Sequence, residues 1–217
     1  MILTDYFRSN HDVTWDYALQ CGVNHGVIRL PETDDFDLTD KSHWQTVYKR
    51  FVDYGIKPII IEPMPNCVHD HIKAGDSLRD ESIEKVIKML PIMRDLDIDT
   101  ICFNFMAHIG WLRTKNDILE RGGAFVTGFD INDFMDSGKS ISENELWKNY
   151  EYFLKAVVPE AEKNGIKLAL HPDDPPLAKL GNVSRIMISG NNIKIKRKDF
   201  WCRSGPYLRY SQDSGQK

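Results

Sequence analysis

Four short segments of the chain are almost wholly apolar and lack the polar alternation of a half-exposed strand. They are rich in Ile, Val, Leu or Phe, so each predicted strand should be covered on both faces, as in a parallel sheet flanked by helices. The predicted strands span residues 26–30, 57–62, 100–106 and 166–171.

Apolar residues between these strands recur at the three- and four-residue spacing of amphipathic helices. The spacing predicts helices over residues 44–52, 83–90 and 146–161. Gly55 should cap the first helix, and Pro91 should kink or end the second.

The ends of the predicted helices carry further signals. Asp80 or Ser82 is expected to cap the start of the second helix. Ser142 and Glu145 have the spacing of a capping box before the third helix, which should close at the Asn-Gly pair 164–165.

Strands and helices alternate, which predicts right-handed crossovers and a parallel sheet. Residues 107–142 interrupt this order as a long loop, and loops of that length are usually functional or disordered. A doubly wound sheet would call for a GxGxxG motif or a P-loop after a strand, and the sequence has neither. Each predicted strand instead ends on a polar residue, as at the mouth of a (β/α)8 barrel: Arg29, Glu62, Asn104 and His171.

The chain has 217 residues, 41% of them hydrophobic, which suffices for one domain with a sizeable core or at most two small ones. No apolar run approaches the ~18–20 residues of a membrane helix, and the first residues lack a signal-peptide pattern, so no membrane association is expected. The four cysteines form no CxxC pair, which favours a reducing, cytoplasmic location: Cys21, Cys67, Cys102 and Cys202.

The net charge of −4 is the sum of two unlike segments. Residues 1–193 hold 21 basic and 30 acidic residues, whereas residues 194–217 hold seven basic and two acidic ones. The sequence therefore predicts an acidic body over 1–193 and a poorly ordered basic tail over 194–217. No nucleic-acid partner is expected, because the acidic body would oppose binding through the short basic run at 194–198.

Histidines near two strand ends are candidate metal or substrate ligands. His171 begins a His-Pro-Asp-Asp-Pro-Pro sequence, which suits a divalent-metal site because carboxylates can orient an imidazole ligand. The alternative is a strand-end histidine capped by a proline-rich turn. His69 and His71 flank Asp70 in the predicted loop after the second strand, as loose ligand spacing or as part of a solvated polar loop.

Other polar residues suit an anionic, hydroxylated small molecule. Arg113 could clamp a carboxylate or pack on the indole of Trp111 at the surface. Asn104 could bind a hydroxyl group or satisfy the backbone of its strand end, and Arg29 could clamp substrate or pair with Glu62. No Ser-His-Asp or Cys-His nucleophile set is apparent, so the residues favour metal-assisted chemistry.

Four stretches resemble the mannonate dehydratase family of glucuronate catabolism: residues 17–30, 61–71, 100–114 and 168–188. The most specific patterns are FNFM followed by WLRT, and LHPDDPP followed by LGNVSRI. The resemblance implies a xylose-isomerase-like (β/α)8 barrel and a cytoplasmic hydro-lyase that uses Mn²⁺ or Fe²⁺ to convert D-mannonate to 2-dehydro-3-deoxy-D-gluconate. It implies His171 as a metal ligand and places Asn104, Arg113, His69 and His71 near the site.

The resemblance ends at about residue 192, where the family would continue into later strands that carry its other metal ligands and its acid–base residues. We therefore expect only about the first four βα units, with the catalytic residues unknown. A frameshift or truncation near residue 193 would account for the tail.

Two alternatives to the dehydratase remain. One is an inactive half-barrel fragment, and the other is a related metal-dependent sugar isomerase or epimerase. A half barrel leaves exposed sheet edges, so a homo-oligomer is possible.

Overall fold

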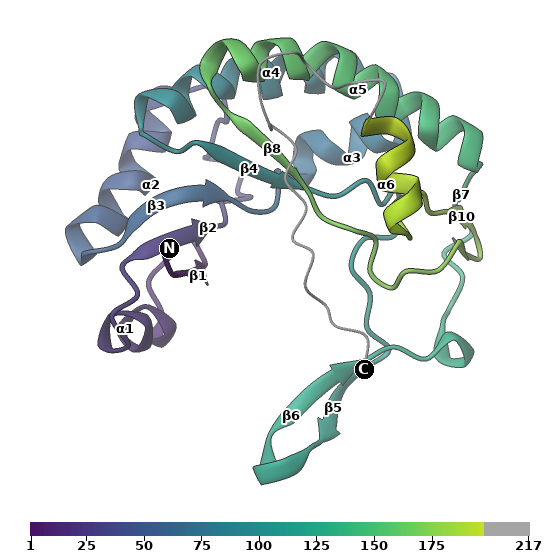
Figure 1. Cartoon of the computed structure of the whole chain (residues 1–217), viewed down its shortest axis with the longest axis horizontal. Helices are drawn as coiled ribbons and strands as arrows, with labels where there is room; N and C mark the ends of the chain where they lie inside the picture. The colour runs from purple at the N-terminus through teal and green to yellow at the C-terminus, as the bar shows by residue number, and fades with distance from the viewer. Residues whose placement is uncertain (198–217) are drawn as a thin grey trace.

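A curved sheet of five parallel strands forms the centre of the molecule (Figure 1). The computed structural model describes residues 1–197, with side chains as far as residue 193. The strands lie side by side in chain order, so that each new strand is added at the same edge. They are β1 (Thr4–Phe7), β2 (His25–Ile28), β3 (Lys57–Ile61), β4 (Thr100–Phe103) and β8 (Lys167–Leu170).

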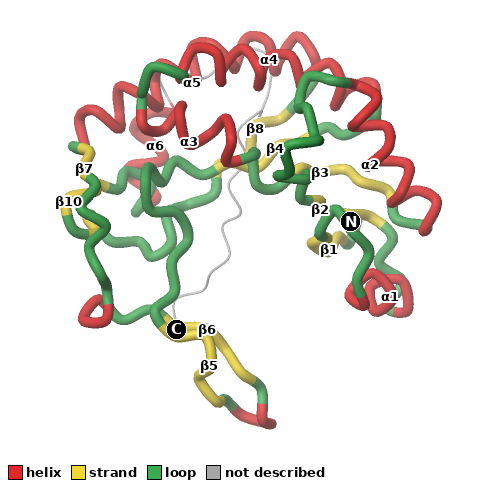
Figure 2. Tube along the Cα trace, turned by 180° about the vertical axis from the view of Figure 1, so that it is seen from behind, coloured by secondary structure: helices red, strands yellow, loops and turns green. Residues whose placement is uncertain are grey.

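Helices α2, α4 and α5 form an arc along the convex side of this sheet (Figures 1 and 2). The chain therefore has the layers of an incomplete barrel, with strands inside and helices outside. The helices are α1 (Val13–Gln20), α2 (Lys41–Tyr54), α3 (Asn66–Ala74), α4 (Arg79–Asp95), α5 (Glu143–Asn164) and α6 (Gly190–Arg197).

The core lies between the sheet and these helices. Near the first strands, Trp15 stacks on Phe51 with ring centroids 4.2 Å apart, and Phe7 packs edge-on against both rings. All three side chains are fully buried, and each large aromatic side chain removed from water contributes on the order of 2–3 kcal/mol. The anchoring of α1 and α2 on β1 therefore rests on this aromatic cluster.

The alternating parallel fold and its three expected long helices are confirmed. Gly55 ends α2 in the left-handed region (φ 96°), which glycine adopts without steric cost. Ser142 and Glu145 make both bonds of the capping box at the start of α5, which closes at Gly165. The four expected strands all pair in parallel.

The sheet has one more strand than expected. Strand β1 and helix α1 precede the first predicted strand, so the described chain holds five βα units and not four. Only Phe7 of the four residues in β1 is buried, and so short a segment carries no apolar run. The parallel pairing with β2 holds this segment in the extended form, although its sequence does not indicate a strand.

Two local expectations were wrong. Residues 66–74, expected in a loop, form helix α3, in which Val68 and Ile72 face the core one turn apart. Leu78 precedes the first residue of helix α4, in place of the expected caps Asp80 and Ser82. The helix runs through Pro91 to Asp95, so of the two alternatives for Pro91 the end of the helix is excluded. The buried neighbours of Pro91 keep their packing, which offsets the one backbone donor that proline lacks.

The long insertion after β4 contains a hairpin that projects from the body (Figure 1). Its strands are β5 (Lys115–Leu119) and β6 (Phe125–Gly128), joined through the short helix η1 (Arg121–Gly123). A second short helix follows, η2 (Ile131–Asp133). The insertion then returns as β7 (Ser140–Ile141), which pairs with β10 (Asn182–Ser184), itself paired with β9 (Lys179–Leu180).

Helix α6 includes residues 194–197, where no helical pattern was expected. The rest of the expected tail, residues 198–217 with Cys202, lies outside the described residues. Within the described part, Cys21, Cys67 and Cys102 are free thiols. No described helix combines the length and apolar character needed to cross a membrane.

A buried arginine ties together the loops that follow β4 and β8. Arg185 is 2% exposed, and its Nη2 donates to the carbonyl oxygens of Ile109 (3.1 Å) and Gly110 (3.0 Å). Its charge also acts on the buried carboxylate of Asp173, which follows β8. One guanidinium therefore joins two segments that are more than 60 residues apart in the chain.

Asp173 in turn holds the segment that carries Arg185. Its Oδ2 accepts hydrogen bonds from the backbone N–H groups of Ile186 (3.0 Å) and Met187 (2.8 Å). Burial raises the pKa of Asp173, although the Met187 N–H and the Arg185 charge act in the opposite direction. These two charged side chains thus depend on each other inside the protein.

Replacing the helix cap Ser142→Ala should lower the free energy of unfolding by about 1 kcal/mol, because the backbone N–H of Glu145 loses its acceptor. Urea denaturation followed by circular dichroism measures the change. Ser77→Ala is the matched control, since Ser77 is exposed and its side chain bonds to none of the described residues. Equal effects of the two substitutions would contradict the role of the cap.

Replacing Arg185→Met should cost about 3 kcal/mol of stability, because the buried carboxylate of Asp173 loses a nearby positive charge and the carbonyl groups of Ile109, Gly110 and Asp174 lose a donor. Arg121→Met, at an exposed arginine of η1, should change stability by less than about 0.5 kcal/mol. Midpoints of urea unfolding distinguish the two. A change below about 1 kcal/mol for Arg185→Met would show that the tie between the loops is weak.

Candidate active site

The residue that directly follows each of the five parallel strands lines one cavity of about 790 Å³, which we call the mouth cavity. Parallel strands end at the same edge of a sheet, and in barrel folds that edge carries the active site. The five residues are Arg8, Arg29, Glu62, Asn104 and His171. Four of them were expected from the sequence, and the structure brings these four together.

His171 presents one ring nitrogen without a protein partner among the described residues. Its Nδ1 lies 2.6 Å from the carbonyl oxygen of Pro172. A carbonyl oxygen only accepts hydrogen bonds, so Nδ1 carries a proton, and in the neutral ring Nε2 keeps its lone pair. A backbone contact that orients a histidine in this way is typical of metal-ligating imidazoles.

Asn104 and Glu62 both line the cavity, and each has one contact inside the protein. Asn104 bonds to the backbone, and Glu62 contacts the Cys102 thiol. The Oδ1 of Asn104 accepts from the N–H of Met106 at 3.1 Å, which leaves its amide N–H groups as donors. Burial, together with Glu62, raises the pKa of the Cys102 thiol to about 12, so this cavity-lining thiol is protonated at neutral pH. Both alternatives for Asn104, backbone support and ligand binding, are therefore compatible with its position.

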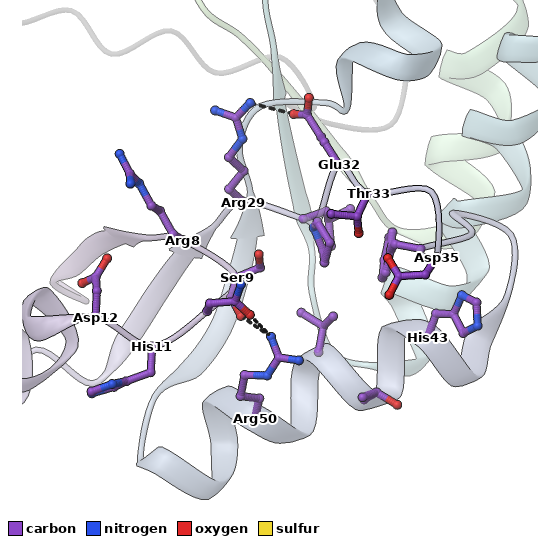
Figure 3. A pocket seen from close by; sticks show the side chains of 16 residues that line it. Arg8, Ser9, His11, Asp12, Arg29, Glu32, Thr33, Asp35, His43 and Arg50 are labelled. Atoms are coloured by element: carbon purple, nitrogen blue, oxygen red, sulfur yellow. Dashed lines mark hydrogen bonds and ion pairs between the residues drawn. The ribbon is translucent and has the colours of Figure 1, made fainter.

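Arg29 pairs with Glu32 and not with Glu62. Its Nη2 lies 2.8 Å from Oε1 of Glu32 (Figure 3). Arg8, on the neighbouring strand end, makes no hydrogen bond or ion pair with the described residues and is drawn without one in Figure 3. Arg8 and Arg29 thus put positive charge at one side of the mouth cavity, and Arg8 has no anionic partner among the described residues.

A second cavity, of about 890 Å³, lies between the loops after β1 and β2 and helix α2 (Figure 3). Arg8 and Arg29 line it as well, so the two cavities adjoin. On its floor, Arg50 donates to the carbonyl oxygen of Ser9 (2.6 Å) and to Oδ1 of Asn10 (2.7 Å). This contact holds the loop after β1 on α2 and so supports the position of Arg8.

Arg113 does not line the mouth cavity. Its guanidinium group is engaged in an ion pair with Asp174. Both of its Nη atoms donate to the carboxylate of Asp174, at 2.9 and 2.7 Å, and the guanidinium lies 4.1 Å from the ring centroid of Trp111. The hydrogen bonds from Arg113 lower the pKa of Asp174. Trp111 does line the cavity, so Arg113 holds a wall of the site in place.

His69 and His71 do not meet at the mouth cavity. They lie on α3, and His69 is fully buried against the rings of Phe103, Phe105 and Phe153. Burial keeps the pKa of His69 well below its usual range, so the ring is neutral. His69 therefore does not line the mouth cavity in this structure, and its role toward substrate stays a prediction. His71 faces outward, with Nδ1 2.8 Å from Oδ2 of Asp76.

Several cavity residues were missed in the sequence. Arg8 escaped because β1 was not recognised, although it obeys the same rule as the other strand ends. Asp70 and Lys73 line the wall from α3, one helical turn apart, where a loop was expected. His108 lines it in the left-handed backbone region (φ 58°), which is uncommon for a residue other than glycine.

The donor set around His171 is too small for a complete metal centre. No group of three or more His, Cys, Asp or Glu side chains within residues 1–193 is arranged to hold a metal ion. A divalent transition-metal site in a protein normally takes at least three such ligands. The described side chains therefore fit one ligand of such a centre and not the whole.

The full lining of the mouth cavity joins basic, acidic and aromatic side chains. Such a mixture suits a small anionic ligand with hydroxyl groups, and the volume falls within the usual range for small-molecule sites. The lining residues are Tyr6, Arg8, Arg29, Glu62, Pro63, Asn66, Asp70, Lys73, Cys102, Phe103, Asn104, Met106, His108, Gly110, Trp111 and His171.

Known proteins match the chain both in sequence and in structure. The family model for D-mannonate dehydratase (UxuA) matches residues 2–137 and 130–199, beyond the point near 192 where the resemblance was expected to end. The mannonate dehydratase of Streptococcus agalactiae is 34% identical over 204 residues, which covers 81% of this chain and 58% of that protein. The enzyme of Lactococcus lactis is 31% identical, with 81% and 59% covered.

Among solved structures, mannonate dehydratase from Streptococcus suis superposes with a TM-score of 0.80 at 26% identity, over 91% of this chain and 60% of that one. A D-allulose 3-epimerase from Methylomonas sp. reaches 0.54 at 11% identity, over 94% of this chain and 60% of that one, and shares the fold alone. The chain spans about three fifths of the length of the curated relatives it matches. With a family model that covers most of its sequence, the chain belongs to the D-mannonate dehydratase family.

Proposed function

We propose that the chain binds D-mannonate in the mouth cavity, as part of a metal-dependent hydro-lyase site that converts it to 2-dehydro-3-deoxy-D-gluconate. The convergence of Arg29, Glu62, Asn104 and His171 on one cavity carries this proposal. Membership of the dehydratase family supports the reaction, and the mixed basic and polar lining supports a sugar acid as ligand.

Three of these residues have chemistry that matches the substrate. The guanidinium of Arg29 would attract the carboxylate, and charge-assisted hydrogen bonds of this kind are stronger than neutral ones. The amide of Asn104 would donate to a hydroxyl group, and the carboxylate of Glu62 would accept from another. Together they would hold the sugar chain in one orientation, which lowers the entropic part of the barrier.

Arg113 takes a different role in this proposal from the carboxylate clamp expected from the sequence. Its ion pair with Asp174 would have to break before it could bind substrate. We propose that Arg113 positions the indole of Trp111, so that the wall next to His171 keeps its shape.

A divalent ion such as Mn²⁺ or Fe²⁺, when bound, would polarise substrate oxygens and stabilise the negative charge that develops as the proton α to the carboxylate is lost. We propose His171 as one ligand, because its Nε2 keeps its lone pair. The described residues do not complete the centre, so no step of the reaction is assigned to the ion.

A second candidate function is sugar-acid binding without catalysis. The donor set within residues 1–193, which is too small for a complete metal centre, favours it. In this case the cavity would bind D-mannonate and release it unchanged.

Incubation of the purified chain with D-mannonate and Mn²⁺ distinguishes the two candidates. If the chain is a hydro-lyase, the keto acid should form and be detected by NMR, and no keto acid should form once EDTA has removed the metal. Binding of D-mannonate without product would support the second candidate. Absence of both binding and product would contradict both.

Replacing Arg29→Gln should weaken D-mannonate binding roughly ten- to hundredfold, because a charge-assisted hydrogen bond contributes about 1.5–3 kcal/mol. Isothermal titration measures the dissociation constant. Arg121→Gln, at the exposed arginine of η1, serves as the control and should leave the constant unchanged. Equal affinity in the Arg29 variant would remove this residue from the binding site.

A further inference from the structure

A buried lysine lines the mouth cavity and is not used by the proposed function. Lys73 lies near the end of α3, and only 2% of it is exposed to solvent. It shares the cavity wall with Asn104, His108 and His171. Lysine is among the residues that are almost never fully buried unless they are paired.

The backbone holds this lysine firmly in place. The Nδ2 of Asn149, on α5, donates to the carbonyl oxygen of Lys73 at 3.0 Å. Gly75 ends α3 at φ 67°, and a Cβ built there would lie 2.5 Å from the Asn149 side chain. The glycine therefore permits the close approach of α5, and the contact keeps Lys73 on a rigid element and not on a loop.

The ammonium group of Lys73 has one charged partner among the described residues. Its Nζ lies 2.8 Å from Oδ1 of Asp70, whose side chain is 62% exposed. Burial lowers the pKa of Lys73, the Asp70 charge acts against this, and the nearby Arg185 adds to the lowering. An ammonium group can donate three hydrogen bonds, so one carboxylate leaves capacity for a further acceptor.

Three other cations near the cavity are already engaged with the protein, whereas Arg8 at the end of β1 makes no ion pair with the described residues. Arg113 is bound bidentately by Asp174, and Arg185 donates to backbone carbonyl groups. Arg29 is paired with Glu32. Lys73 is thus a buried positive charge that lines the same cavity wall as His171.

We propose that Lys73 is a further substrate-binding residue, whose ammonium group binds the carboxylate of a sugar acid in the mouth cavity in competition with the carboxylate of Asp70. This inference rests on the proposed function and adds, beside Arg29, a second and buried cation that favours a sugar acid over a neutral sugar. A desolvated cation gains more from an anionic ligand than an exposed one does, because less water screens the attraction.

The test compares D-mannonate with D-mannitol, the neutral polyol that lacks the carboxylate. Lys73→Met should weaken D-mannonate binding at least tenfold and leave D-mannitol binding within about twofold, both measured by isothermal titration. Lys73→Arg keeps the charge and should restore most of the affinity. The methionine variant should fold, because an apolar side chain suits the buried position and Asp70 is largely solvated.

Lys85→Met provides the matched control. Lys85 is paired with Glu81 on α4, and its side chain is 46% exposed, so its loss should leave both affinities unchanged. Asp70→Asn tests the direction in which the affinity for D-mannonate changes. It also provides a test if Lys73→Met fails to fold. It removes a competing negative charge, so D-mannonate should bind at least as tightly as to the unmodified chain.

The outcomes separate the two proposals. Equal affinity of Lys73→Met and the unmodified chain for D-mannonate would overturn the role of Lys73 and leave the proposed function intact. Equal losses for D-mannonate and D-mannitol, or weaker D-mannonate binding in Asp70→Asn, would assign the Lys73–Asp70 pair a structural role. If the unmodified chain binds no D-mannonate, both proposals fail.

Discussion

The parallel pairing of five strands is the constraint on which the candidate site depends. In this register Phe7 pairs with Ile28, Ile28 with Ile61, and Phe103 with Leu170. Strands β1, β2 and β3 therefore end level with one another, and β4 and β8 end level with each other two residues further on, because Ile61 pairs with Ile101. The next residue of each strand lines the same opening. A polar residue in that position has no place in the apolar layer below, so the end of each apolar run is also the beginning of the cavity.

Several charged side chains near this opening are buried, and each makes a different kind of contact. Arg185 donates to carbonyl groups of one loop and lies near Asp173, which accepts from the backbone of the other. Lys73 reaches the carboxylate of Asp70 at the boundary with solvent. Buried ions of this kind add little net stability, but they specify which loops meet. Electrostatic contacts therefore hold the loops around the cavity, and the apolar core lies beneath them.

The fold of this chain is shared with sugar epimerases, whereas its loops match the dehydratase family. Sugar epimerases share the strand and helix order at 11% identity, which carries no information about chemistry. The match to the dehydratase family extends through the loops that form the cavity, including the segment after β4 and the proline-rich segment after β8. Because function depends on such loops, the family match is the stronger guide to the ligand.

The sequence by itself determined the alternation of strands and helices, the helix caps at Gly55 and Ser142, and four of the five strand-end residues. These features depend on local patterns: apolar runs, three- and four-residue spacing, and capping chemistry. Only the tertiary structure decided that Arg8 joins the cavity, that His69 is buried, that Asp174 occupies Arg113 and that Lys73 lines the wall. Each of these depends on contacts between segments far apart in the chain, or on a short element whose order comes from its neighbours, and no local pattern encodes such contacts.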